Sequence, residues 1–197
     1  MRIILASASP RRAEVLRDAG IAFEAVSTNA DESRRPDEAP EELVRRLAEA
    51  KAKAAAAKVA ATGPAIVVGA DTEVVVDVPG KEEVLGKPAS AADAREMLRR
   101  LSGRTHSVVT GLAVIRLPDG ASRSELETTH VTIALLSERE IEEYVASGEP
   151  FDKAGAYAIQ RRAGRFVTRV EGCYFNVVGL PLARLYRILR ELGWSNG

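Results

Sequence analysis

Short apolar runs alternate with stretches of helical spacing along this chain, and the alternation is the strongest guide to its fold. Residues 2–6 (RIILA), 65–70 (AIVVGA) and 74–78 (VVVDV) have the composition of buried strands. Residues 40–61 and 90–101 have the apolar spacing and strong helix formers of α-helices. Strands interleaved with helices, with hairpins in the second half, predict an α/β protein built on a mixed twisted sheet.

The other elements follow from capping and turn signals. Ser9 suits an N-cap, Pro10 suits the first helical position, and Gly20 suits a helix stop, so a helix follows the first strand directly. The remaining expected helices are 137–146, opened by a capping box, and 181–192. The remaining expected strands are 107–117, 124–136, 155–159, 165–170 and 174–178, and the expected loops are 27–40 and 79–88.

Length, charge and cysteine content narrow the class of protein. The 197 residues, of which 46% are hydrophobic, suit one domain spanning the chain, with no linker that would separate two. Lys and Arg balance Asp and Glu at 28 each, which argues against a protein that mainly binds nucleic acid. Cys173 is the single cysteine and the N-terminal apolar run is short, so we expect a cytoplasmic protein that is not inserted in a membrane.

The turn between the first strand and the first helix is a candidate anion site. Backbone N–H groups at a helix N-terminus favour an anion, and the helix dipole adds to this preference. Ser7, Arg11 and Arg12 would add donors to phosphate oxygens. A capped helix with solvated arginines is the plainer interpretation, and the chain has no P-loop motif.

Asp71 follows the apolar run 65–70, and ligands in open α/β sheets lie beyond the carboxyl ends of strands. A carboxylate there can bind a hard cation such as Mg²⁺ or accept a proton from water. Glu32 in the polar loop, Lys51 with Lys53 on the long helix, and Lys87 add carboxylate and ammonium groups. Each alone is more often a solvated charge, but together they are sufficient for triphosphate chemistry.

Residues 152–160 (DKAGAYAIQ) are unusual for a plain strand and suggest a place where the backbone approaches a ligand. Gln160 can both donate to and accept from the edge of a base. His106 and His130 are the only histidines; a peripheral role in a site is open for His106, and His130 is expected on a surface or strand face.

Seven sequence blocks, in order and over nearly the whole chain, resemble the Maf family. The blocks are S-x-S-P-R-R at 7–12, G-A-D-T at 69–72, G-K-P at 86–88, L-S-G-R-T-H at 101–106, T-G-L at 110–112, D-K-A-G-A-Y-x-I-Q at 152–160 and N-V-V-G-L-P at 176–181. The resemblance implies an elongated α/β fold similar to the inosine triphosphate pyrophosphatases, with two lobes and a cleft, and usually a homodimer. It also implies a divalent metal such as Mg²⁺, Mn²⁺ or Co²⁺.

The implied reaction is hydrolysis of a nucleoside triphosphate to the monophosphate and pyrophosphate. The resemblance implies that Asp71 accepts a proton from the attacking water and that Asp71 and Glu32 together place the metal. The residues implied to hold the triphosphate are Ser7, Arg11, Arg12, Lys51 and Lys87. Arg11, Thr72 and Gln160 are similar to the subgroup that acts on dTTP and UTP, whereas Arg161 and Arg162 stand where a glycine would be usual.

Two other readings of function remain open at this point. One is the same reaction on another or modified nucleotide, as nucleotide-pool housecleaning. The other is a non-catalytic regulator of septum formation or cell division, a role that would not require Asp71, Glu32 and Lys87. Nucleic-acid binding is disfavoured by the neutral charge and by the 5% aromatic content.

Overall fold

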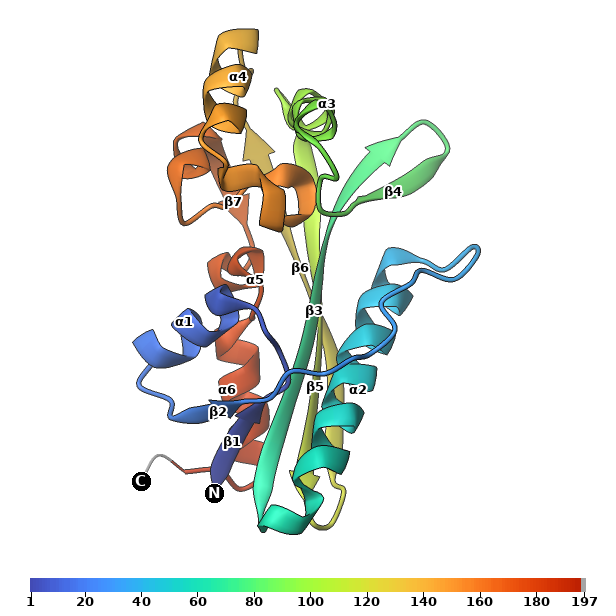
Figure 1. Ribbon diagram of the computed structural model, residues 1–197, viewed down its shortest axis with the longest axis vertical. Helices are drawn as coiled ribbons and strands as arrows, with labels where there is room; N and C mark the ends of the chain where they lie inside the picture. Colours follow the sequence, from blue (N-terminus) through green and yellow to red (C-terminus); the bar gives the residue numbers. More distant parts are fainter. Residues whose placement is uncertain (196–197) are drawn as a thin grey trace. The chain divides into compact units, whose positions relative to one another are not determined.

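A computed structural model describes residues 1–195 and shows a mixed sheet with helices beside it (Figure 1). The strands are β1 Arg2–Leu5, β2 Phe23–Ala25, β3 Ala65–Val78, β4 Lys81–Leu85, β5 Thr105–Leu117, β6 Ser122–Ile133 and β7 Val167–Glu171. The helices are α1 Pro10–Asp18, α2 Pro40–Val59, α3 Ala91–Leu101, α4 Glu138–Ala146, α5 Tyr174–Val178 and α6 Leu182–Glu191.

The seven strands pair in the order β2-β1-β3-β5-β6-β7, with β4 paired to β3. The strand β1 is parallel to β2 and β3, whereas the β3–β4 and β6–β7 pairs are antiparallel. The predicted mixed sheet of an α/β protein is therefore confirmed. No helix within residues 1–195 is long and apolar enough to span a membrane.

The contacts divide the chain into two compact units. Unit 1 consists of Met1–Asp71, Thr110–Glu127 and Gly179–Gly197, and unit 2 consists of Thr72–Val109 and Thr128–Val178. Each unit is thus assembled from segments that are separated in the sequence, and neither is one continuous stretch. The prediction of a single domain over the chain stays a prediction.

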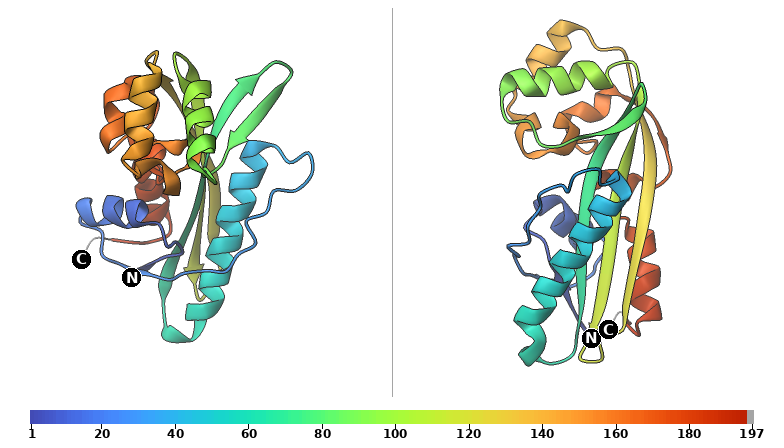
Figure 2. Two further views of the ribbon diagram at one scale, coloured as in Figure 1. Left: turned by 45° about the horizontal axis from the view of Figure 1, so that its top comes forward. Right: turned by 90° about the vertical axis from the view of Figure 1, so that its right-hand side faces the viewer.

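Unit 1 is a layered structure in which α2 lies on one side of the strands and α1 and α6 lie on the other (Figures 1 and 2). Two glycines let α2 approach the sheet closely. A Cβ added at Gly69 would lie 2.3 Å from the Ala48 carbonyl oxygen, and one at Gly111 would lie 2.2 Å from the Val44 carbonyl oxygen. The alanine-rich sequence of α2 suits this approach, because small side chains allow two backbones to come together.

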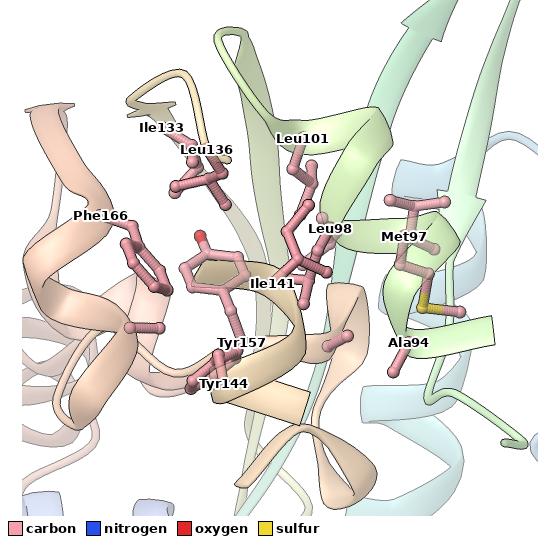
Figure 3. Packing of buried hydrophobic residues seen from close by; sticks show 14 of the residues in the cluster. Ala94, Met97, Leu98, Leu101, Ile133, Leu136, Ile141, Tyr144, Tyr157 and Phe166 are labelled. Atoms are coloured by element: carbon pink, nitrogen blue, oxygen red, sulfur yellow. The ribbon is translucent and has the colours of Figure 1, made fainter. Parts of the chain in front are cut away.

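Unit 2 has its own hydrophobic core, formed between the strands, α3, α4 and the turns around residues 154–166. Figure 3 shows part of this cluster. Met97 and Leu101 come from α3, Ile141 and Tyr144 from α4, and Phe166 packs edge-on against Tyr144 with ring centroids 5.7 Å apart. The capping box predicted at the start of α4 is present, with the Ser137 hydroxyl accepting from the Glu140 N–H.

The structure corrects four of the expected elements. Residues 65–78 form one continuous strand, and 81–85, expected in a loop, are β4, because hairpin pairing from Val74–Leu85 to Val78–Lys81 extends the ladder. Residues 155–159 were expected as a strand, but Gly155 and Ala156 have φ of 67° and 59°, which a strand does not allow. Residues 174–178 form the short helix α5, since a short apolar run alone does not separate helix from strand.

Candidate active site

Three of the predicted charged residues meet in unit 1. The Lys51 ammonium lies 2.6 Å from the Glu32 carboxylate and 2.6 Å from the Asp71 carboxylate. Lys51 and Asp71 are buried, whereas the Glu32 side chain is 58% exposed. The cluster therefore has a buried half and a half that faces solvent, as a site that receives a charged ligand from water requires.

Backbone geometry places the two buried members of this cluster. Gly69 lies against Ala48 and Ala52 of α2, so Lys51 is brought close to β3 where Asp71 follows two residues after Gly69. Because Lys51 lies one helical turn after Leu47 and two after Leu43, it belongs to the buried face of α2. Lys53, its companion in the sequence prediction, is 71% exposed and pairs with Glu49 on the same helix.

Asp71 does not lie at the carboxyl end of its own strand, as the sequence had suggested. It lies in the interior of β3, and the strand that ends nearby is β1, whose last residue Leu5 pairs with Val68. The hydrogen bond from Ala6 N–H to the Val68 carbonyl continues that pairing. The strand end that leads directly into a predicted site residue, Ser7, is therefore that of β1.

One oxygen of Asp71 is suited to a further ligand. Oδ1 accepts a hydrogen bond from Lys51, whereas Oδ2 is buried and has no hydrogen-bond partner among residues 1–195. A buried acceptor without a donor is costly, so it favours binding of a cation or a water molecule. No group of three or more His, Cys, Asp or Glu side chains in the described chain forms a metal cage. Two carboxylates still fit Mg²⁺, which commonly takes one or two from protein and the rest from phosphates and water.

The turn from β1 to α1, where the sequence predicts an anion site, is held by hydrogen bonds of its own side chains. α1 begins at Pro10, as predicted, and the N–H of Ser9 donates to the Ser7 hydroxyl at 3.1 Å. Arg12 is buried and donates from Nη1 to the Ser7 hydroxyl at 3.2 Å and from Nε to the Gly179 carbonyl at 2.7 Å. Arg12 therefore fixes the turn, and Arg11 is the more exposed of the two arginines.

The loop that carries Glu32 is tied to α2 by two residues that the sequence analysis did not single out. Arg46 donates to the buried Glu38 carboxylate through Nε at 2.6 Å and through Nη2 at 2.8 Å. These hydrogen bonds lower the pKa of Glu38 to about 2. No local pattern joins two residues that are eight positions apart across a helix start, so only the structure reveals the pair.

The remaining predicted residues, Thr72, Lys87 and Gln160, belong to unit 2. Lys87 is exposed and follows Gly86, whose carbonyl accepts a hydrogen bond from the Gly155 N–H at 3.1 Å. A Cβ at Gly155 would lie 2.9 Å from a Val74 methyl carbon, and φ is positive there, so both space and backbone require glycine. The G-K-P and D-K-A-G blocks are thus in direct contact, and Gln160 is partly exposed near the end of the second block.

His106 is buried in unit 2 and pairs with Tyr157 of the D-K-A-G-A-Y block. The His106 Nε2 and the Tyr157 hydroxyl are 2.8 Å apart, and the rings meet edge-on. Burial lowers the pKa of His106 from 6.5 to about 4. His130 is exposed on β6, as expected.

This pKa predicts a pH-dependent loss of stability. The folded pKa of His106 lies below the unfolded value, so the unfolded chain binds the proton first as the pH falls from about 6.5 to about 4. Across that window His106 should lower the free energy of unfolding by about 3 kcal/mol. Urea unfolding of His106→Gln at pH 7, 6, 5 and 4 should show a flatter pH dependence than wild type, and His130→Gln is the matched control. Parallel curves for wild type and His106→Gln would contradict the prediction.

The fold and site together define a mixed-sheet α/β protein in which unit 1 contains both a lysine–carboxylate cluster and a helix start with donors for anions. Sequence comparison places it in a family: the Maf-like protein family matches residues 2–192, so the chain belongs to the Maf family. The resemblance read from the seven sequence blocks is confirmed.

Curated relatives match along nearly their whole length. The chain is 49% identical to the dTTP/UTP pyrophosphatase of Koribacter versatilis over 98% of this chain and 95% of that protein. It is 49% identical to the dTTP/UTP pyrophosphatase of Vibrio cholerae, with 96% and 97% covered. The protein of the same description from a Geobacillus species is 47% identical, with 98% and 99% covered.

Two solved structures show weaker similarity. A nucleoside-triphosphatase described as a dITP/XTP pyrophosphatase from Mycobacterium abscessus is 21% identical, with a TM-score of 0.41 over 69% of this chain and 76% of that one. The Ham1 protein of Staphylococcus aureus is 18% identical, with a TM-score of 0.44 over 68% and 72%.

Proposed function

We propose that this protein hydrolyses nucleoside triphosphates, with dTTP and UTP preferred, to the nucleoside monophosphate and pyrophosphate. The observation that carries the proposal is the cluster in which buried Lys51 lies between Asp71 and Glu32. Its residues stand at the positions that the family resemblance assigns to catalysis, in a chain similar over its length to dTTP/UTP pyrophosphatases. Removal of such triphosphates would serve nucleotide-pool housecleaning.

The triphosphate carries negative charges, which cationic side chains must neutralise and to which N–H groups can donate hydrogen bonds. Ser7, Arg11 and the α1 N-terminus supply donors in unit 1, and Arg12 holds the Ser7 hydroxyl in place. Lys51 and Lys87 supply ammonium groups. Phosphoryl transfer depends mainly on positioning and charge neutralisation, so this set is sufficient without a histidine.

Asp71 and Glu32 would hold a divalent cation such as Mg²⁺, Mn²⁺ or Co²⁺. Asp71 Oδ2 is available for this role, and Glu32 faces solvent. When bound, the cation neutralises phosphate charge and orients the triphosphate. The Lys51 Nζ already lies 2.6 Å from an oxygen of each carboxylate, so a bound cation would share these carboxylates with Lys51 or partly displace its ammonium group.

In the proposed reaction, Asp71 accepts a proton from a water molecule as the water oxygen attacks the α-phosphorus. The bond between the α-phosphorus and the α–β bridging oxygen breaks, and pyrophosphate leaves with that oxygen. Arg11, together with a lysine, stabilises the charge on the leaving group. These two carboxylates and the lysine favour an enzyme over a non-catalytic regulator of cell division.

The position of the broken bond is testable through its products. Hydrolysis of dTTP in ¹⁸O-labelled water should place the label in dTMP and release pyrophosphate, because the attack occurs at the α-phosphorus. Mass spectrometry of both products reads the label directly. Orthophosphate and dTDP as products, or label in the released phosphate, would contradict the proposed geometry of attack.

Base preference gives a second prediction. Thymine and uracil present an acceptor–donor–acceptor edge, to which Gln160 can both donate and accept, with Thr72 completing the contacts. Cytosine replaces one carbonyl by an amino donor, and an unpaired polar group in a pocket costs about 1–3 kcal/mol. We expect kcat/KM for dTTP and UTP to exceed that for CTP and the purine triphosphates by about 10–100-fold.

Competition assays on wild type and Gln160→Ala measure this preference. Gln160→Ala should narrow the gap between UTP and CTP more than it lowers the rate with UTP. Lys153→Met in the same block provides a comparison, since Lys153 donates to the Glu149 carbonyl at 2.5 Å inside unit 2. Equal use of CTP and UTP by the wild type would remove Gln160 from base selection and leave the hydrolysis itself standing.

A cytoplasmic location and a homodimeric state belong to the same proposal. The location rests on the single cysteine, and the dimer rests on the family resemblance. A mass measurement by light scattering on the purified protein separates monomer from dimer.

A further inference from the structure

The loop that carries Glu32 has little core packing to hold it in place. Residues 31–37 are all exposed and contain no helix or strand. A catalytic carboxylate on such a loop would spend much of its time away from Lys51 and Asp71 unless another contact restrained it. The structure shows a restraint of this kind a few residues further along the loop.

Glu38 is the buried end of the loop and is held from several directions. Its carboxylate accepts two hydrogen bonds from Arg46 and a third from the Arg35 N–H at 3.1 Å. Its backbone carbonyl accepts from Arg34 through Nη2 at 2.7 Å. A bidentate arginine–carboxylate pair with added backbone bonds is geometrically specific, in contrast to an exposed ion pair.

Arg46 also reaches the residue next to Glu32. Its Nη2 donates to the Ser33 carbonyl at 2.9 Å, and the Ser33 N–H donates to Asp31 Oδ1 at 2.9 Å. The backbone on the C-terminal side of Glu32 is therefore fixed to α2, the helix that also carries Lys51. One guanidinium thus joins the two ends of the loop segment 33–38 to the helix of the active site.

We propose that Arg46 and Glu38 are positioning residues that hold the loop so that the Glu32 carboxylate stays opposite Lys51. The proposal rests on the proposed function for the role of Glu32 in hydrolysis. The restraint of the loop itself is independent of any reaction, because it is a property of the folded chain.

Arg46→Lys is the informative substitution, since lysine keeps the charge but cannot make the bidentate pair and the Ser33 contact together. Arg95→Lys is the matched control. Arg95 makes the same bidentate geometry with Glu142, at 2.7 and 2.9 Å, in unit 2. Glu38→Gln is the second variant, and it should reproduce the effects of Arg46→Lys because it weakens the same pair from the other side.

Amide hydrogen exchange tests the restraint without substrate. In Arg46→Lys, the amides of Ser33 and Arg35 should exchange about tenfold faster, while the interior amides of α2 stay as in wild type. Arg95→Lys should leave the exchange of residues 31–38 unchanged. Unchanged exchange of this loop in both Arg46→Lys and Glu38→Gln would overturn the proposal, whatever the enzyme assays show.

A double-mutant cycle tests whether the pair acts through Glu32. Arg46→Lys should lower kcat with dTTP by about 10–100-fold and raise the Mn²⁺ concentration needed for half-maximal activity. In a Glu32→Gln background, the same substitution should change kcat by less than about twofold. Equal losses in both backgrounds would overturn the positioning role. Absence of pyrophosphate release by the wild type would instead refute the proposed function, and the exchange data would still decide the restraint of the loop.

Discussion

Asp71→Asn is expected to lower kcat with dTTP by about 10²–10⁴-fold, the range that general-base groups contribute. The substitution removes the group that accepts the proton and one of the two carboxylates proposed to hold the metal, with almost no change in volume. Lys51 keeps Glu32 as a partner at 2.6 Å, so its ammonium is not left without a counter-charge. The fold should therefore survive, and thermal melts should show a single cooperative transition.

Asp77→Asn is the matched control, because Asp77 is an exposed aspartate on the same strand. It should keep wild-type kcat. Calorimetry with Mn²⁺ and a non-hydrolysable analogue of dTTP should show weaker metal binding for Asp71→Asn only. A kcat for Asp71→Asn within a few-fold of wild type would assign the proton transfer to another group.

Gly69→Ala is expected to destabilise unit 1 and to disturb the lysine–carboxylate cluster at the same time. The added methyl would lie 2.3 Å from the Ala48 carbonyl oxygen and 2.7 Å from the Ala52 nitrogen, and these backbone atoms cannot rotate away. Overpacking of this kind costs about 3 kcal/mol, the upper part of the usual range. For a chain of this size, that corresponds to a melting temperature lower by about 6–12 °C.

The clash between the added methyl and the backbone of α2 would also push α2, and with it Lys51, away from Asp71. Misplacement of a positioned group by about 1 Å costs up to about 100-fold in rate, so kcat should fall well below the loss explained by unfolding. Gly86→Ala is the stability control, because no described atom lies within 4 Å of its added Cβ and its φ is not positive. A melting temperature of Gly69→Ala within about 1 °C of wild type would correspond to a loss of stability of less than about 0.5 kcal/mol. Such a result would contradict the close approach of α2 to Gly69.

Much of the fold could be predicted because its signals are local. Pro10 and the Ser137 capping box each specify the chain near themselves, and the helices that they predict, α1 and α4, are present. The wrong predictions concern elements whose structure depends on strand pairing or on unusual backbone angles. Residues 81–85 form β4 because they pair with β3. Residues 155 and 156 both have positive φ, so they cannot belong to a strand.

The candidate site could be predicted as a set of residues but not as an arrangement. Glu32, Lys51 and Asp71 are separated by about twenty residues each, and nothing in the sequence states that one lysine bridges both carboxylates. The choice between Lys51 and Lys53 was available, because Leu43, Leu47 and Lys51 recur every four residues on one helix face. The Arg46–Glu38 pair had no such signal, since charged residues near a helix start are usually solvated.

The division of unit 1 into three separated segments has a consequence for synthesis on the ribosome. Residues 1–71 emerge first, yet Arg12 finds one of its acceptors in the Gly179 carbonyl, which is made more than a hundred residues later. Until then the β1–α1 turn lacks that anchor, and α6 is not yet available to cover its side of the strands. Pairings so distant along the chain form slowly and leave apolar surface exposed in the meantime. Residues 1–71 thus cannot complete the packing of unit 1 until the last segment is made, and chaperone contact during translation is most useful to this part of the chain.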